Sequence, residues 1–226
     1  LRGIMADPLK PAGVRCRGVL EGNSPGIVFT DDVIRPTWAV ARESAFGTLY
    51  PAGAVSKPTL TALVDEFRRA GEVLIGFWPG DPLVEVFPDA PEYDGLVLDF
   101  MDRPVREGLE HLLSPIPEGY VVRQMDCDLH RQSPWYDDRL KTYGSINEIL
   151  KREIGFGLVR GETLVSEASA SPVATGVLDI GTITHEDFRG RGYATFICAY
   201  LIRECERRGF QTYWNCNKEN LASAAL

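Results

Sequence analysis

The sequence predicts an α+β protein that folds as two successive domains, and three observations lead to this prediction. Short β-rich runs and helical patterns alternate through both halves of the chain. A long amphipathic helix follows a glycine-rich turn near the C-terminus. Between the halves lies the Pro-rich stretch 114–119, where Pro115 and Pro117 disfavour a helix and interrupt a sheet ladder. We therefore expect one αβ domain over residues 1–115 and a second over residues 119–226.

The first half is predicted to hold one clear helix among several strands. The helix runs from Pro58 to Ala70, with the proline in its first turn, apolar residues along one face and Gly71 as its stop. The strands are predicted from β-rich runs bounded by Gly, Pro, Asn and Asp. These runs are residues 14–21, 26–30, 37–43, 72–78 and 95–101, and a short helix or turn is expected around residues 82–87.

The second half has a similar mixture of elements. Ser145 is expected to cap a helix, because Glu148 three residues later completes a capping box. Around it we expect strands at residues 120–126, 154–160, 162–170, 175–184 and 210–216, a polar segment at 128–140, a tight turn at Gly161-Glu162 and a break at Ser171-Pro172. A turn at residues 217–220 leads into a last helix.

The long helix that follows the glycine-rich turn has the clearest pattern. Five residues recur at the i, i+3, i+4, i+7 and i+11 spacing of one buried face. They are Ala194, Ile197, Cys198, Leu201 and Cys205. Glu204 and Arg208 form a favourable i,i+4 pair on this helix, and Gly209 is expected to end it.

The turn itself, Arg189-Gly190-Arg191-Gly192-Tyr193-Ala194, combines a strand end, two glycines and a helix start. Free backbone N–H groups at the positive end of a helix dipole bind anions, and glycines allow a phosphate to approach closely. Two arginines add phosphate-binding charge to a chain that is acidic overall. The spacing matches neither a Walker loop nor the dinucleotide fingerprint. The alternative interpretation is a glycine-rich helix start with two solvated arginines.

Composition excludes several classes of protein. The formal net charge of -8 argues against a general nucleic-acid binder and suits a cationic substrate. The 5 cysteines form no C-x-x-C pair and are accompanied by only 3 histidines, so we expect no metal site and reduced thiols. No apolar run is long enough for a membrane span or a signal peptide, so we expect a cytoplasmic protein.

Residues 175–226 resemble the GNAT acetyltransferase superfamily. The acyl-CoA signature of that family is Q/R-x-x-G-x-G/A, and residues 189–194 match it at every specified position. The flanking segment Asp179-Ile-Gly-Thr-Ile-Thr184 and the group Trp214-Asn-Cys216, Asn220 and Ser223 resemble one branch of the family, which includes the zwittermicin A resistance acetyltransferases. The resemblance implies a GNAT fold: a central, mostly antiparallel sheet that is splayed at the acyl-CoA site and flanked by helices.

The resemblance also implies acetyl-CoA as co-substrate and a set of residues that bind it. The pantetheine arm should pair with the strand ending at Ile183-Thr184, and backbone N–H groups of the loop should hold the pyrophosphate. The implied acetyl-CoA-binding residues are Ile183, Thr184, Arg189, Gly190, Arg191, Gly192, Tyr193, Ala194 and Asn220. An amine would then attack the thioester, and a backbone N–H near Ile183 would stabilise the oxyanion.

Asp179 is the first candidate for the catalytic base, because it interrupts the apolar strand Val177-Leu178-Asp179-Ile180. The alternative is that Asp179 faces solvent or satisfies a neighbouring backbone group. Glu167 and His185 are weaker candidates. Many GNAT enzymes carry a tyrosine as general acid, and in register that position falls just past Leu226. We expect the second domain to be truncated at its C-terminus, because the chain stops inside a helical pattern before the last strands of the fold.

Three functions fit these features. The first is an N-acetyltransferase that acts on a primary amine of a small molecule, as a monomer or homodimer. The second is a non-catalytic acyl-CoA-binding sensor or scaffold, and the third is an acetyltransferase of protein lysines or N-termini. The acidic segment 126–143, with Trp135 and Tyr136, either recruits a cationic amine or is a solvated connection. Trp214 also has two interpretations, as a wall of the acceptor pocket or as core.

The first half resembles a GNAT domain only in the order of its elements. The helix from Pro58 to Ala70 corresponds to the CoA-binding helix, but the preceding segment 46–53 lacks the R-x-x-G-x-G pattern. We therefore expect a degenerate GNAT-like domain that no longer binds CoA.

Overall fold

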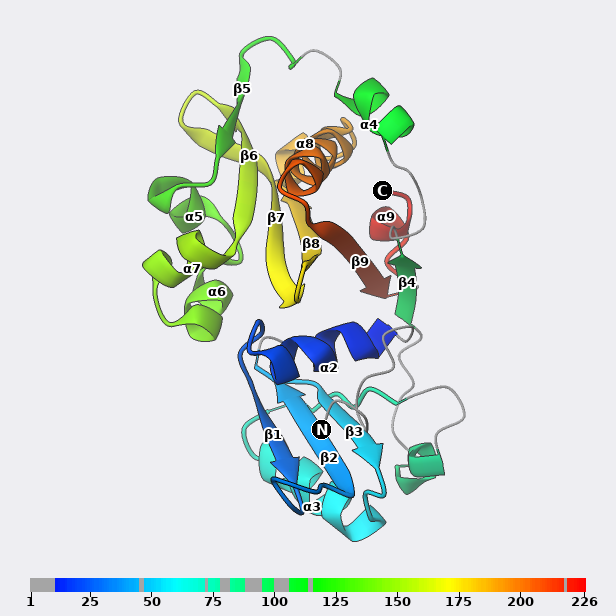
Figure 1. The fold of residues 1–226 in the computed structure, drawn as a ribbon. Coiled ribbons are helices and arrows are strands. Elements are labelled where there is room, and N and C mark those ends of the chain that lie inside the picture. The colour runs from blue at the N-terminus through cyan, green and yellow to red at the C-terminus, as the bar shows by residue number, and fades with distance from the viewer. Residues whose placement is uncertain are drawn as a thin grey trace. The chain divides into compact units, whose positions relative to one another are not determined.

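The computed structural model describes residues 11–44, 47–71, 73–77, 82–87, 95–99, 106–113, 116–217 and 219–226 (Figure 1). The chain divides into two compact units. The first consists of Leu1–Glu92 with Val173–Thr175, and the second consists of Tyr93–Pro172 with Gly176–Leu226. The sequence placed the boundary at residues 114–119. The structure divides the chain earlier because strand β4 (Gly95–Asp99) pairs with a strand near the C-terminus and so joins the second unit.

The first unit is built on a three-stranded antiparallel sheet in the order β1-β2-β3. Alternate residues of the middle strand point to opposite faces. Ala39 and Ala41 pack with Cys16, and Val40 packs with Leu60. The elements are α2 (Pro11–Glu21), β1 (Gly26–Thr30), β2 (Trp38–Glu43), β3 (Leu49–Gly53), α3 (Lys57–Arg68) and the 3-10 helix η1 (Pro82–Val86). The predicted strands at 26–30 and 37–43 and the helix at 58–70 are thereby confirmed.

The predicted strand at residues 14–21 is wrong, because this segment lies in helix α2. Its apolar residues fit both the alternation of a strand and the spacing of a helix. Cys16, Val19 and Leu20 lie at helical i, i+3, i+4 spacing and share one hydrophobic cluster. An i,i+4 ion pair joins Arg17 Nε to Glu21 Oε1 at 3.3 Å, an interaction that only the helix provides. Burial of one helical face therefore decides between the two patterns.

Two further predictions in the first unit differ from the structure. Residues 73–77, the described part of the strand expected at 72–78, form only an isolated bridge between Ile75 and Leu49. The segment 46–53, which precedes the predicted helix in the position of the CoA-binding loop, contains β3, whose Leu49 and Tyr50 are buried against the helices. Burial on both faces of the sheet makes this apolar segment a strand.

The second unit contains a six-stranded sheet in the order β4-β9-β8-β7-β6-β5. Its β4–β9, β5–β6 and β6–β7 pairs are antiparallel and its β8–β9 pair is parallel. Its elements after β4 are α4 (Arg106–Leu112), β5 (Tyr120–Gln124), α5 (Cys127–Gln132), α6 (Tyr136–Tyr143), α7 (Ile146–Arg152), β6 (Ile154–Arg160), β7 (Thr163–Ala174), β8 (Val177–Thr184), the 3-10 helix η2 (Glu186–Phe188), α8 (Tyr193–Arg207), β9 (Gln211–Asn217) and α9 (Leu221–Ala224).

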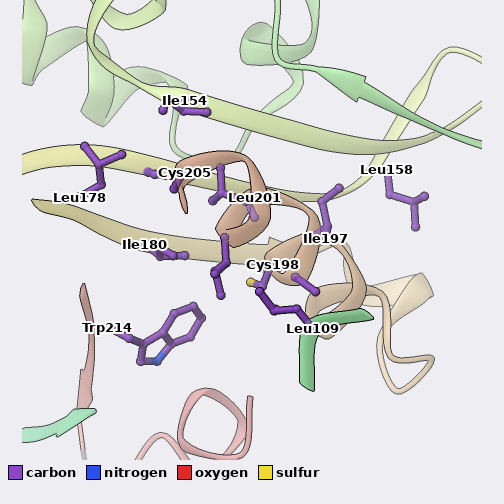
Figure 2. Packing of buried hydrophobic residues seen from close by; sticks show 14 residues of the cluster. Leu109, Ile154, Leu158, Leu178, Ile180, Ile197, Cys198, Leu201, Cys205 and Trp214 are labelled. Atoms are coloured by element: carbon purple, nitrogen blue, oxygen red, sulfur yellow. The ribbon is translucent and has the colours of Figure 1, made fainter. Parts of the chain in front are cut away.

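Helix α8 covers one face of this sheet and supplies much of the core (Figure 2). Ile197, Cys198, Leu201 and Cys205 are buried as the periodicity predicts, whereas Ala194 is only half-buried. They pack with residues of β6, β7, β8 and β9. Those partners are Ile154, Leu158, Ala168, Ala170, Leu178, Ile180 and Trp214. The predicted Glu204–Arg208 pair is present, with 2.7 Å between Glu204 Oε1 and Arg208 Nε.

Helices α5 and α6 occupy the segment 128–140, which the sequence left as an unassigned polar stretch. The Asp126 side chain caps α5 by accepting hydrogen bonds from the backbone N–H groups of Asp128 and Leu129. Most of the charged residues face solvent, so the apolar signal comes mainly from Leu129, which is 1% exposed. Ser145 caps α7 as predicted, accepting from the Glu148 N–H at 3.3 Å.

The break expected at Ser171-Pro172 is also wrong. Strand β7 continues to Ala174, and the chain turns at Thr175-Gly176, where Gly176 has a φ of 77°. The Ser171 side chain donates to Glu153 Oε1 at 3.0 Å, which ties this part of β7 to the end of α7.

Strands β8 and β9 are paired only over their first residues and then diverge. The parallel pairing joins Val177 to Gln211, Leu178 to Thr212 and Asp179 to Tyr213, and it goes no further. The divergence is visible in Figure 1, where β9 turns away toward β4. The expectation of a mixed α+β fold with a splayed, mostly antiparallel sheet flanked by helices is therefore confirmed.

Candidate functional site

Strand β8 leads directly from this splay into the glycine-rich loop. Gly190 and Gly192 have φ values of 72° and 76°, a left-handed conformation that costs little only for glycine. A Cβ added at either position would meet no atom within 4 Å, so the space in front of the loop is open. Gly192 caps α8 without any side-chain hydrogen bond, and the first helical bond is from the Phe196 N–H to the Gly192 carbonyl.

The α8 N-terminus therefore presents backbone N–H groups of its first turn that have no partner inside the helix. Such groups lie at the positive end of the helix dipole. Arg189 and Arg191 are exposed on either side of Gly190. Arg189 Nε donates to the Thr184 carbonyl at 3.0 Å, and Arg191 Nη2 donates to the Asp187 carbonyl at 3.1 Å. Within the described residues neither guanidinium forms an ion pair, so the loop keeps its positive charge.

Three contacts hold the loop and the strand end in place. The Tyr193 ring packs on the Tyr120 ring of β5, with centroids 5.2 Å apart. The Ser166 hydroxyl of β7 lies 2.8 Å from Thr184 Oγ1 and donates to the Ile183 carbonyl at 3.3 Å. Ile183 and Thr184 are thus fixed to β7 on one side. On the other side, among the described residues, β8 has no ladder partner beyond Asp179.

Asp179 lies at the fork where β8 and β9 separate. It is half-buried, and its Oδ1 accepts a hydrogen bond from Asn215 Nδ2 of β9 at 3.4 Å. Leu178 and Ile180 belong to the core beneath α8, so Asp179 and Gly181 face the opposite side of the sheet. The Trp135 ring lies on that side, because a Cβ on Gly181 would be 3.4 Å from its Cη2 and Cζ3 atoms.

The two weaker base candidates have different surroundings. Glu167 is 1% exposed and is held by Arg139 Nη2 at 3.1 Å and by the Ser133 hydroxyl at 2.8 Å, both on its Oε1. Arg139 also pairs with Glu153 Oε2 at 3.1 Å. His185 precedes η2 and makes no side-chain cap. Glu167 is therefore part of a buried ion-pair cluster, which leaves Asp179 as the carboxylate at the fork.

Comparison with known proteins decides the family. The family model described as GNAT acetyltransferase matches residues 15–226, nearly the whole chain. The chain belongs to the GNAT acetyltransferase family. Enzymes of this family use acetyl-CoA as co-substrate, so the predicted family, enzyme class and co-substrate are confirmed at this level.

Single relatives extend the comparison. A curated Bacillus subtilis (strain 168) protein, the uncharacterized N-acetyltransferase YdfB, is 25% identical over 113 residues. That match covers 49% of this chain and 43% of YdfB, so the chain matches less than half the length of this curated relative.

Two solved structures share the fold. A GCN5-related N-acetyltransferase-like protein from Streptococcus suis 89/1591 has a TM-score of 0.68 at 23% identity, covering 91% of this chain and 83% of its own. A tandem GNAT protein from the clavulanic acid biosynthesis pathway has a TM-score of 0.59 at 14% identity, covering 95% and 83%.

Asn220 and Trp214 complete the set of residues that the GNAT resemblance singled out. The Asn220 side chain caps α9 by accepting from the Ser223 N–H at 3.1 Å, and it is exposed. Trp214 is 5% exposed and belongs to the core beneath α8. We predicted no role for Asn215, although its polar side chain beside Trp214 in the predicted strand 210–216 was the available signal.

The described residues contain no helix long and apolar enough to span a membrane. They also contain no group of three or more His, Cys, Asp or Glu side chains able to hold a metal ion.

Proposed function

We propose that this chain transfers the acetyl group of acetyl-CoA to a primary amine of a small molecule by direct attack. One observation carries the proposal. Strand β8 loses its partner β9 after Asp179 and then runs into an open helix N-terminus flanked by two arginines. A linear acyl donor with a pyrophosphate at one end suits this arrangement, because the edge of β8 offers backbone pairing and the helix end binds an anion.

In the proposed complex the pyrophosphate lies on the backbone N–H groups of Arg191, Gly192 and Ala194. The two arginine side chains of the loop leave their carbonyl partners and reach phosphate oxygens, where a charge-assisted bond is stronger. The pantetheine arm lies along β8 and pairs with Ile183 and Thr184. Asn220 contacts the arm from the start of α9 while it caps that helix.

The reaction then follows from the position of the fork. A neutral primary amine attacks the thioester carbon, a C–N bond forms, and the carbonyl oxygen becomes an oxyanion that a backbone N–H near Ile183 stabilises. The intermediate collapses, the C–S bond breaks and CoA leaves as a thiolate. Asp179 takes the proton that the cationic amine must lose before it attacks, directly or through a water molecule. After the attack, the nitrogen of the intermediate loses a second proton, which reaches the departing thiolate directly or through solvent. Juxtaposition of the two reactants contributes much of the rate.

The acceptor is proposed to bind on the face of the sheet opposite α8. Asp179 and Gly181 face that side, and they are two residues apart on β8, about 7 Å along the strand. The Trp135 ring covers Gly181 and is itself held by Arg139, whose Cζ lies 5.3 Å from the ring centroid. An aromatic face beside a carboxylate favours a cationic amine. The acidic segment 126–143 would then attract it.

We further propose that the first half of the chain, predicted from the sequence as residues 1–115, is a degenerate GNAT-like domain. The acetyl-CoA-binding domain, predicted as residues 119–226, also takes in β4 and α4, which pack with it. In the first unit strands β1, β2 and β3 precede helix α3, and in the second unit strands β6, β7 and β8 precede helix α8. The α3 N-terminus, however, is already occupied: the Ser56 hydroxyl accepts from the Thr59 N–H at 3.2 Å, and Pro58 has no N–H to offer. This difference supports a single acetyl-CoA site per chain, in the second domain.

Membership of the branch that includes the zwittermicin A resistance acetyltransferases is also part of the proposal. It rests on the Asp179–Thr184 stretch and on Trp214, Asn220 and Ser223. A cytoplasmic location and a monomeric or homodimeric state remain predictions. A non-catalytic acyl-CoA sensor and a protein acetyltransferase are the competing functions.

The test is a turnover assay with the full chain. Acetyl-CoA is mixed with a panel of primary amines, including diamines, aminoglycosides and a lysine peptide, and release of CoA is followed by mass spectrometry. We expect turnover of a small amine, and we expect Asp179→Asn to lower kcat by about 10²–10⁴-fold without weakening acetyl-CoA binding. The matched control is Asp65→Asn, an exposed carboxylate of α3.

Each other result selects another function. Binding of acetyl-CoA without turnover of any amine supports the sensor. Turnover of the lysine peptide alone supports a protein acetyltransferase. An Asp179→Asn variant that keeps its kcat excludes Asp179 as the base.

A further inference from the structure

Trp214 carries a buried polar group that the fold does not satisfy. Its side chain is 5% exposed, and its indole Nε1 has no hydrogen-bond partner within the described residues. An indole nitrogen can only donate, and buried donors in native proteins almost always have an acceptor. The group therefore requires an acceptor that the described residues do not supply.

The position of Trp214 relates this donor to the splay. Tyr213 is the last residue of β9 that pairs with β8, opposite Asp179, and Trp214 is the next residue along β9. On its other edge β9 pairs with β4, where Leu98 stands opposite Trp214. The indole thus lies on the first residue of β9 after the strands separate.

The packing of the ring shows which way the donor points. Trp214 shares a cluster with Ile180 of β8 and Cys198 of α8. In Figure 2 the indole nitrogen lies on the side of the ring away from Cys198 and the other helix residues. The apolar part of the ring therefore faces the core while the N–H faces away from it.

We infer that the Trp214 indole N–H donates a hydrogen bond to a carbonyl oxygen of bound acetyl-CoA. This inference rests on the proposed function, in which the acyl donor fills the gap between β8 and β9. The pantetheine arm carries two amide carbonyls, and the thioester adds a third.

In the described part of the chain, two groups beside the gap between β8 and β9 lack a hydrogen-bond partner. The edge of β8 has no ladder partner beyond Asp179 among the described residues, and the indole of β9 has no acceptor. A linear chain of amides placed between the strands satisfies both, since its N–H and carbonyl groups pair with β8 while one carbonyl accepts from Trp214. A buried water molecule would satisfy the indole alone.

The experiment is an NMR titration of the full chain labelled with ¹⁵N-tryptophan. The chain has 4 tryptophans, so 4 indole signals are expected, and the Trp214 signal is assigned by triple-resonance spectra and by its loss in Trp214→Phe. Three probes are added separately: acetyl-CoA, CoA, and adenosine 3′-phosphate 5′-diphosphate, which has the pyrophosphate but no pantetheine arm.

We expect acetyl-CoA to shift the Trp214 indole proton downfield and the truncated nucleotide to leave it unchanged. An equal shift with CoA assigns the acceptor to an amide carbonyl, and a shift with acetyl-CoA alone assigns it to the thioester. Calorimetry should show that Trp214→Phe weakens acetyl-CoA about three- to tenfold, as for one hydrogen bond, and leaves the truncated nucleotide unaffected. Trp38→Phe, in the first unit, is the control.

Two results overturn the inference in different ways. If acetyl-CoA binds, as calorimetry reports, and the Trp214 signal does not move, the indole is satisfied by water and the proposed function stands. If acetyl-CoA does not bind at all, the proposed function fails and this inference fails with it.

Discussion

Removal of the Arg139 guanidinium tests the physical account of the second unit most severely. Arg139 is 7% exposed and lies between two buried carboxylates, with Glu153 Oε2 and Glu167 Oε1 each 3.1 Å from its nitrogens. It also donates to the Ser133 hydroxyl at 2.9 Å and to the Ser169 hydroxyl. Arg139→Met keeps much of the side-chain volume and removes the only cation of this cluster in the described part of the chain.

The expected cost follows from the two carboxylates left behind. Breaking a buried ion pair by removing one partner costs about 3–5 kcal/mol, because an uncompensated charge stays in the interior. Burial already raises the pKa of Glu153, and Arg139 opposes that rise. Without Arg139 the folded pKa of Glu153 lies further above its unfolded value. Stability is then lost as the pH rises, so the cost should be larger at pH 7.5 than at pH 5.5.

Urea unfolding followed by far-UV circular dichroism measures this cost at both pH values. The triple variant with Glu153→Gln and Glu167→Gln added to Arg139→Met removes every charge of the cluster and should recover most of the stability. The control is Arg131→Met, which breaks an exposed pair with Asp128 and should change stability by about 0.5 kcal/mol or less. A cost below about 1 kcal/mol, or an equal cost at both pH values, would refute the reasoning.

Three further predictions concern stability and reactivity. Burial lowers the pKa of His130 to about 4, and the charge of Arg139 makes a smaller contribution. Since the unfolded chain takes up this proton near pH 6.5 and the folded chain only near pH 4, stability should fall by roughly 2–3 kcal/mol between these values. Urea unfolding at pH 7 and pH 4.5 should show a smaller fall for His130→Gln, and equal falls would contradict this. Ser145→Ala should cost about 1 kcal/mol through loss of the α7 cap, and Ser145→Asp should not; thermal unfolding compares them, and indistinguishable variants would exclude the cap. Burial raises the pKa of Cys198 and of Cys205 to about 12, so iodoacetamide at pH 8 should modify the partly exposed Cys127 and Cys216 before them, as peptide mass spectrometry would show. Early labelling of Cys198 would show that α8 opens readily.

The parts of the fold that the sequence predicted well are those in which local chemistry and burial agree. The glycines at 190 and 192, the apolar stripe of α8 and the stop at Gly209 each have one low-energy solution. The Ser145 cap belongs to the same class. The position of the fork at Asp179 was accessible only through the family resemblance, because strand pairing depends on residues 34 positions apart.

The predictions that were wrong depend on tertiary contacts. Residues 14–21 carry a pattern that suits a strand and a helix equally, and the cluster around Cys16 decides in favour of the helix. The segment 128–140 contains few apolar residues. Its first helix is held by Leu129, which packs with Met125, Val159 and Leu164, and its second by the buried ion pairs of Arg139. The contact between Trp135 and Gly181 joins segments that are distant in sequence, so no local sequence pattern predicts it.

The most direct test of the central claim is calorimetric titration of the full chain with acetyl-CoA. We predict one site per chain, and a loss of affinity of about ten- to a hundredfold in Gly192→Glu, whose carboxylate enters the open space in front of the α8 N-terminus. Gly209→Glu imposes a similar left-handed strain, with φ of 81° against 76°, at the other end of the same helix, and it should bind as the wild type does. Equal affinity in the wild type and Gly192→Glu, or no binding to either, would contradict the claim that this loop holds the pyrophosphate of the acetyl donor.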